Sequence, residues 1–153
     1  MSAPATLGRE GIAQRIPHQG RMCLLDRLEA WDAESIRCSS GTHHEADHPL
    51  RSTSGLLAPA AIEYAAQAMA LHGALVAPPG VRPAPGYLAS VRGVRLHRAR
   101  LDDVASRLVV QAQRLAGDDT QILYRFTVAD EAGAVLAEGR ATVVLNTPLP
   151  DPS

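Results

Sequence analysis

One carboxylate, Glu63, interrupts an apolar stretch, residues 56–76, whose only other strongly polar side chains are Gln67 and His72. Burying an unpaired charge is costly, so this group must be paired, protonated or facing a cavity. We expect the apolar setting to raise the pKa of Glu63, which suits a general acid or base near neutral pH. The simpler alternative is structural, since the helix dipole stabilises an acid in a first helical turn.

Gln67 and His72 differ in their expected relation to Glu63. Gln67 follows by four residues, so on a helix it lies on the same face, where its amide can hydrogen-bond the carboxylate. His72 follows by nine residues, about half a turn out of phase, and is not expected to join this patch.

The segment that carries these residues is typical of a buried helix. Ala and Leu dominate residues 56–76 and favour helix, and Pro59 is tolerated in a first turn because no N–H is needed there. A helix that is apolar nearly all round must be covered by other elements. We therefore expect one long central helix beginning near residues 56–60.

Segments with strand character flank this helix, two before it and four after it. Apolar and polar side chains alternate in the last two, and 130–133 between them is a hairpin signal, as is 117–119. Gly93 predicts a bulge. An antiparallel sheet curled around the helix buries it most simply, which predicts an α+β hotdog fold. The expected strands are 22–31, 35–41, 86–98, 104–115, 121–129 and 134–145.

Composition places the chain among single-domain globular proteins. It has 153 residues, 46% of them hydrophobic, and a formal net charge of -1. We expect an N-terminal segment at 1–15, one domain at 16–145 and a flexible tail at 146–153. Cys23 and Cys38 are too few for a disulfide framework and are expected to be small buried residues.

Several function classes are disfavoured by the same counts. The 15 basic residues, all Arg, are scattered along the sequence and balanced by 16 acidic ones, so we expect neither nucleic-acid nor membrane binding. No apolar run approaches the ~20 residues of a membrane span, and we expect a cytoplasmic protein. No G-x-S-x-G, P-loop or Rossmann glycine pattern is present.

A polar loop at 43–55 gathers His43, His44 and His48, with Glu45 and Asp47 among them. A zinc site needs three or four such ligands to converge. Histidines that are merely crowded in a loop are commoner, so we expect no metal.

Two motifs give the chain a resemblance to a known family. IPHQGRMCLLDR (16–27) resembles the leader motif of bacterial 3-hydroxyacyl-[acyl-carrier-protein] dehydratases, and AIEYAAQAMA (61–70) resembles their central-helix motif, with Glu63 and Gln67 in matching places. The chain is still more similar to the dehydratase-like branch associated with aryl polyene biosynthesis. The resemblance covers 16–145.

The resemblance implies a homodimer or higher homo-oligomer, possibly with a second dehydratase-like subunit, and no cofactor. The implied substrate is an acyl thioester on the phosphopantetheine arm of an acyl carrier protein. In the family, the helix acid works with a histidine from the other subunit, located in an H-F-P-G loop that is absent here. Residues 49–63 are several residues shorter than the corresponding stretch of the family. Two histidines could replace the missing one: His18 in the leader motif, or His48 just before the shortened stretch. The third alternative is that no histidine does.

The implied reaction is loss of water from a 3-hydroxyacyl thioester, with a histidine, first His18, as base and Glu63 as acid. The N–H groups of Ala60 and Ala61, after Pro59, are expected to receive charge from the thioester oxygen. The start of the following strand is expected to line the acyl tunnel, with Gly86, Tyr87 and Leu88. An acyl thioesterase and a non-catalytic partner subunit or acyl-binding module remain the alternatives.

Overall fold

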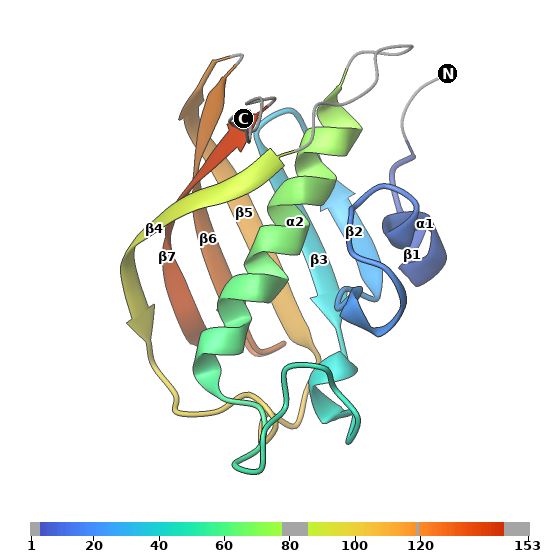
Figure 1. The fold of residues 1–153 in the computed structure, drawn as a ribbon, viewed down its shortest axis with the longest axis vertical. Coiled ribbons are helices and arrows are strands. Elements are labelled where there is room, and N and C mark those ends of the chain that lie inside the picture. Colours follow the sequence, from blue (N-terminus) through green and yellow to red (C-terminus); the bar gives the residue numbers. More distant parts are fainter. Residues whose placement is uncertain (1–3, 78–85, 119, 146–153) are drawn as a thin grey trace, which may run out of the picture.

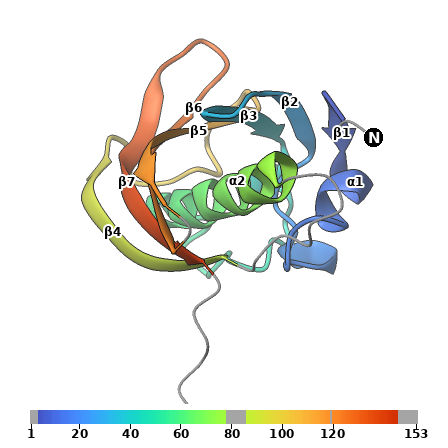
Figure 2. The same cartoon turned by 90° about the horizontal axis from the view of Figure 1, so that it is seen from above.

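Seven antiparallel strands form one curved sheet, and the long helix α2 (Ala61–Val76) lies in its concave side (Figures 1 and 2). The computed structural model describes residues 4–77, 86–118 and 120–145. The predicted architecture, a sheet wrapped around one central helix, is confirmed. The remaining elements are β1 (Leu7–Gly8), α1 (Arg9–Ala13), β2 (Arg27–Trp31), β3 (Ser35–Ser40), β4 (Gly86–Leu96), β5 (Leu108–Gly117), β6 (Gln121–Ala129), β7 (Val135–Leu145) and the 3-10 turns Gly20–Met22, Thr42–His44 and Ala58–Ala60.

The strand order is β1-β2-β3-β5-β6-β7-β4, so β4 crosses from the helix to an edge of the sheet. Strands β6 and β7 form the predicted hairpin, with Phe126 opposite Gly139. Gly139 leaves room for the ring, because a Cβ there would stand 3.0 Å from it. The predicted bulge is confirmed: Gly93 has φ +60° and the register shifts between Arg92 and Arg95.

The central helix follows a 3-10 turn that contains Pro59. Its buried side chains are Ala61, Tyr64, Ala65, Gln67, Ala68, Met69, Leu71, His72 and Leu75, and most of them recur at intervals of three or four residues. Ala77 is extended, as favoured before a proline. Part of the Pro-rich break (78–85), Asp119 of the predicted turn and the tail 146–153 lie outside the described residues.

The N-terminal third departs most from expectation. Only Arg27–Trp31 of the predicted strand 22–31 is a strand, because the backbone at Met22 and Leu24 bonds to a side chain of α2 instead of a neighbouring strand. Residues 7–13 form β1 and α1, and Ile12 is fully buried in the core. Cys23 and Cys38 are buried free thiols, as predicted.

No helix in the described part of the chain is long and apolar enough to cross a bilayer.

Candidate functional site

The structure brings His18 and Glu63 together within one chain. The Nε2 atom of His18 lies 3.0 Å from Oε1 of Glu63, and their side chains are 25% and 33% exposed. The pair is therefore half-buried and partly open to solvent. The family resemblance implied a histidine from the other subunit, whereas here both members belong to the same chain.

Local structure explains both positions. Glu63 is in the first turn of α2, where the helix dipole stabilises a carboxylate. His18 lies in the turn between α1 and the 3-10 turn at Gly20–Met22. The Gln19 amide donates to the Ala13 carbonyl at 2.8 Å, and Gly20 has φ +59°, a left-handed conformation that favours glycine.

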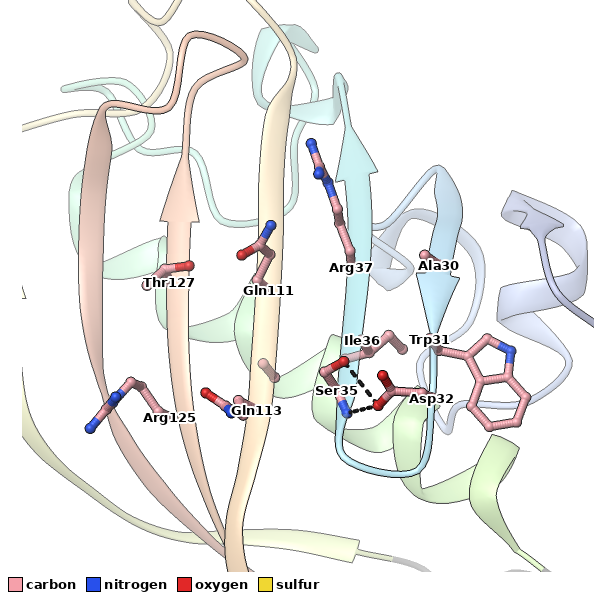
Figure 3. A pocket seen from close by; sticks show the side chains of 11 residues that line it. Ala30, Trp31, Asp32, Ser35, Ile36, Arg37, Gln111, Gln113, Arg125 and Thr127 are labelled. Atoms are coloured by element: carbon pink, nitrogen blue, oxygen red, sulfur yellow. Dashed lines mark hydrogen bonds between the residues drawn. The ribbon is translucent and has the colours of Figure 1, made fainter.

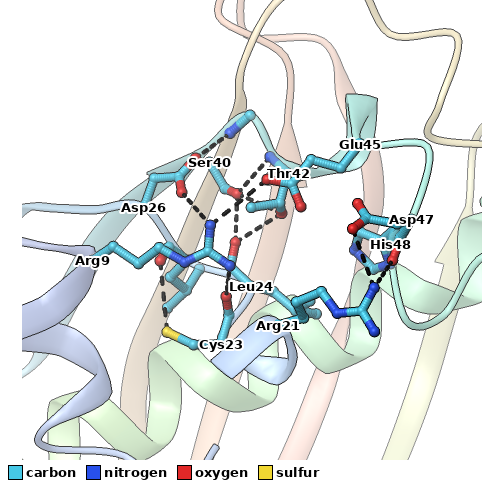
Figure 4. A network of polar contacts seen from close by, with 12 residues as sticks. Arg9, Arg21, Cys23, Leu24, Asp26, Ser40, Thr42, Glu45, Asp47 and His48 are labelled. Atoms are coloured by element: carbon cyan, nitrogen blue, oxygen red, sulfur yellow. Dashed lines mark hydrogen bonds and ion pairs between the residues drawn. The ribbon is translucent and has the colours of Figure 1, made fainter. Parts of the chain in front are cut away.

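Gln67 fixes the leader segment to the helix. Its Nε2 donates to the Met22 carbonyl at 2.6 Å and its Oε1 accepts from the Leu24 N–H at 2.8 Å. The Leu24 carbonyl in turn accepts from the hydroxyls of Ser40 and Thr42 at 2.5 and 2.8 Å (Figure 4). These bonds hold the leader between α2 and the end of β3.

Charged contacts brace the same segment from the other side. Arg9 of α1 donates to the Cys23 carbonyl at 2.9 Å and lies 3.7 Å from a carboxylate oxygen of Asp26 (Figure 4). Asp26 also accepts from the Gly41 N–H at 2.7 Å. The position of His18 therefore depends on side chains from α1, α2 and β3 together.

The electrostatics of Glu63 correct one prediction. The hydrogen bond from His18 lowers the pKa of Glu63, outweighing the desolvation that would raise it, and the His18 charge and the Gln67 amide lower it further. The expected raised pKa is therefore wrong. Burial at this site is partial, so the histidine dominates, and Glu63 is a carboxylate in the resting chain.

His48 occupies a different place. Its Nδ1 accepts from the Leu50 N–H at 3.0 Å, and its Nε2 lies 3.0 Å from the Tyr64 hydroxyl. Burial lowers the pKa of His48 and favours the neutral ring. Both ring nitrogens are thus used in the core, and the alternative pairing of His48 with Glu63 is not formed in this chain.

The other loop and helix histidines are engaged elsewhere. His72 bonds to the Tyr124 hydroxyl at 2.8 Å and the Asp32 carbonyl at 2.9 Å, which confirms that it lies apart from Glu63. His43 and His44 both direct Nε2 to the Val104 carbonyl, at 3.0 and 2.6 Å. Across the described residues, no three potential ligands converge on a metal position.

The predicted oxyanion donors are not free. The Ala60 N–H donates to the Leu57 carbonyl at 3.0 Å, and the Ala61 N–H donates to carbonyls of the 3-10 turn. Ala61 is also fully buried. The prediction that these two amides await a ligand is therefore wrong, because the turn before α2 already satisfies them. Pro59 beside them is exposed.

The predicted tunnel residues lie at the start of the edge strand β4. Gly86 and Tyr87 pair with Leu145 and Val144 of β7, and the Tyr87 side chain lies outside the described part of the chain. Leu88 pairs with Val143 and is exposed. Their role in substrate binding stays a prediction.

Two residues that support the site escaped prediction from the sequence. The hydroxyls of Thr42 and Tyr64 lie 2.7 Å apart and link the leader, through Leu24, to His48. The only signal was the tyrosine directly after Glu63, in a helix that has no other Tyr, Phe or Trp.

Comparisons with known proteins agree with this architecture. A family model described as ApeP-like, ApeP dehydratase, matches residues 10–151. Among solved structures, the dehydratase heterocomplex ApeI:P from Xenorhabdus doucetiae is similar with a TM-score of 0.74 and 22% identity, covering 89% of this chain and 91% of that chain. No curated protein sequence matches significantly.

Thioesterases share the fold as well. A Haemophilus influenzae thioesterase superposes with a TM-score of 0.66 and 14% identity over 100% of both chains. A Pseudomonas aeruginosa thioesterase mutant gives a TM-score of 0.60 and 19% identity, covering 80% of this chain and 81% of that one. The hotdog fold is thus established, and the family match over most of the chain confirms the predicted resemblance: the chain belongs to the ApeP-like dehydratase family.

Proposed function

We propose that the chain removes water from a 3-hydroxyacyl thioester, carried by the phosphopantetheine arm of an acyl carrier protein, to give the trans-2-enoyl thioester. The observation that carries this proposal is the 3.0 Å contact between His18 and Glu63 on a dehydratase-family scaffold. A histidine and a carboxylate in contact supply the proton acceptor and donor that such an elimination needs.

The pair acts as one proton-holding unit. One proton is shared between Nε2 of His18 and Oε1 of Glu63. In the reacting form that proton lies on Glu63, and Nε2 of His18 accepts the proton from C2 of the substrate as the C2–H bond breaks. The electron pair forms the C2–C3 double bond as the C3–O bond breaks. The proton on Glu63 passes to the departing hydroxyl, which leaves as water, and the proton gained by Nε2 becomes the shared proton of the pair.

The geometry suggests how the two residues divide this work. The His18 Nδ1 atom is buried and has no hydrogen-bond partner among the described residues, so the open part of the pair is the edge between Nε2 and the carboxylate. His18 serves as the base through Nε2, and Glu63, which is a carboxylate at rest, donates to the leaving group the proton that it takes over from Nε2. Each transfer contributes typically about 10²–10⁴ in rate.

The test is the identity of the product. The purified chain is given a 3-hydroxyacyl carrier-protein thioester, and the product is read by mass spectrometry together with a thiol assay. Loss of water with no free thiol supports dehydration. Release of free thiol without an enoyl product overturns it and favours the thioesterase alternative, to which the thioesterase neighbours point.

A partner subunit without activity of its own is the second candidate. It is favoured by the similarity to a protein described as a heterocomplex and by the absence of the H-F-P-G histidine from the sequence. Binding of the carrier protein without turnover, combined with co-purification of a second dehydratase-like chain, would support this candidate. Turnover by the chain alone, as a homodimer or higher oligomer, would exclude it.

A further inference from the structure

We propose that the outer face of the sheet, on the side away from α2, is a docking surface for an acidic helix of a partner protein. The observation is a row of three arginines in direct register on adjacent strands. Arg125 of β6 is opposite Arg140 of β7, and Arg140 is opposite Arg92 of β4. This proposal does not depend on the dehydratase activity.

The row is unpaired. All three arginines are exposed, and within the described part of the chain none of them makes an ion pair within 4.0 Å or a side-chain hydrogen bond. Like charges directly opposite each other on a sheet face are destabilising. Three in a row therefore cost the isolated chain stability, and an anionic partner would offset that cost.

The neighbouring row on the same face continues the positive surface. It runs from Arg37 on β3 through Gln111 and Thr127 to Glu138 and Arg95 at the β4 edge. Glu138 is the one carboxylate in these two described rows, and it is bonded to His97 at 2.8 Å. Figure 3 shows Arg37 and Arg125 standing at opposite sides of Gln111 and Gln113.

Three hollows lie along this face and meet at the arginines. Their volumes are about 400, 520 and 410 Å³. The first and third share Arg125 and Thr127, and the second and third share Arg140 and Gly93. The face is therefore recessed between its guanidinium groups, from β3 across β5, β6 and β7 to β4.

Spacing favours a helix over a small anion. Neighbouring strands are about 4.8 Å apart, and the turns of an α-helix repeat every 5.4 Å or so. Carboxylates on successive turns of one helix face would therefore meet successive guanidinium groups, which bind carboxylates in a bidentate manner. A single phosphate group would engage only part of a row this long.

The test uses a fluorescent peptide that forms a helix with Glu on every turn of one face. The control peptide has the same composition but distributes Glu around the helix. We expect anisotropy to show binding of the first peptide that weakens with salt and falls by roughly tenfold or more in the Arg125→Gln, Arg140→Gln double variant. Arg98→Gln, which alters an exposed arginine paired with Asp103, is the matched control and should bind as the wild type does.

Three results would overturn the proposal. They are equal binding of both peptides, unchanged affinity in the double variant, and binding of inorganic pyrophosphate or phosphatidylglycerol vesicles when the peptide does not bind. A urea titration gives a separate check. The double variant should be at least as stable as the wild type, because the substitutions remove repulsion, and a clear loss of stability would assign these arginines to folding.

Discussion

At the scale of single residues, the site depends on one contact that sets the charge of one carboxylate. Glu63 is half-buried, which alone would favour its neutral form, yet its contact with His18 reverses the direction of the pKa change. The sequence could predict the residue but not this direction, since His18 is 45 positions away and only the fold brings it near. At Glu63 the contact with His18, and not burial, decides the direction of the pKa shift.

The contact can be tested directly. Because the hydrogen bond from His18 is the main cause of the lowered pKa of Glu63, His18→Ala should raise that pKa above its wild-type value. Carbon-13 NMR titration of the Glu63 carboxyl measures the change. His97→Ala, which removes an exposed histidine bonded to Glu138, is the control and should leave it unaltered. The same Glu63 titration curve in the His18→Ala variant as in the wild type would contradict the pairing.

Gln67 was predicted to hydrogen-bond the Glu63 carboxylate, but its shortest hydrogen bonds are with the backbone of Met22 and Leu24. Gln67→Leu keeps a similar volume while leaving the buried Leu24 N–H without its partner, so we expect a loss of about 1–3 kcal/mol in the free energy of unfolding. Urea denaturation measures it. Gln121→Leu, at an exposed strand position, should change stability by less than about 0.5 kcal/mol, and an equal loss in both variants would refute the special role of Gln67.

At the scale of elements, α2 is tied to its surroundings by polar contacts as well as by its apolar face. Tyr64 bonds to His48 and Thr42 near the beginning of the helix, and His72 bonds to Tyr124 and the Asp32 carbonyl further along. Buried polar groups that are fully paired specify one arrangement of a core. These contacts fix the rotation of α2, and hence the direction in which Glu63 points.

Coupling between His48 and Tyr64 should be measurable. We predict that Tyr64→Phe and His48→Ala each lower the free energy of unfolding, and that the double variant loses less than the sum of the two. The expected interaction energy is about 0.5–3 kcal/mol, as for residues in direct contact. Strictly additive losses in a urea-based double-mutant cycle would show that the bond contributes nothing.

The long elements could be predicted because their patterns are local. The alternation in Gln121–Ala129 and the apolar composition of Ala61–Val76 each report burial directly. The structure of the stretch from Met22 to Asp26 could not be predicted. An apolar run looks the same in sequence whether its backbone hydrogen-bonds to a strand or to a side chain such as that of Gln67. Likewise, Pro59 correctly predicted the start of the helix, but not that the turn there would satisfy the nearby amides.

At the scale of the whole molecule, three neutral histidines are buried in the fold. Burial is the first cause that lowers the pKa values of His43, His48 and His72. Nothing in a single sequence distinguishes such residues from exposed ones. In the same way, arginines scattered along the sequence are brought into one row only by the register of β4, β7 and β6.

These histidines predict a stability that falls in mild acid. Below the ordinary histidine pKa of about 6.5, the unfolded chain takes up protons that the folded chain refuses, so unfolding becomes easier as the pH falls from 7.5 to 5.5. For three such groups, the free energy of unfolding falls by at most about 4 kcal/mol for each pH unit. Urea titrations at several pH values measure it, and constant or rising stability toward pH 5.5 would be the contrary result.

The most direct measurement is the initial rate of enoyl-thioester formation from a 3-hydroxyacyl carrier-protein thioester, compared between the wild type, His18→Ala and Glu63→Gln. With the fold verified by circular dichroism, we predict a loss of about 100-fold or more in each variant, and no loss in His97→Asn. Undiminished turnover in both variants would contradict the assignment of the reaction to His18 and Glu63.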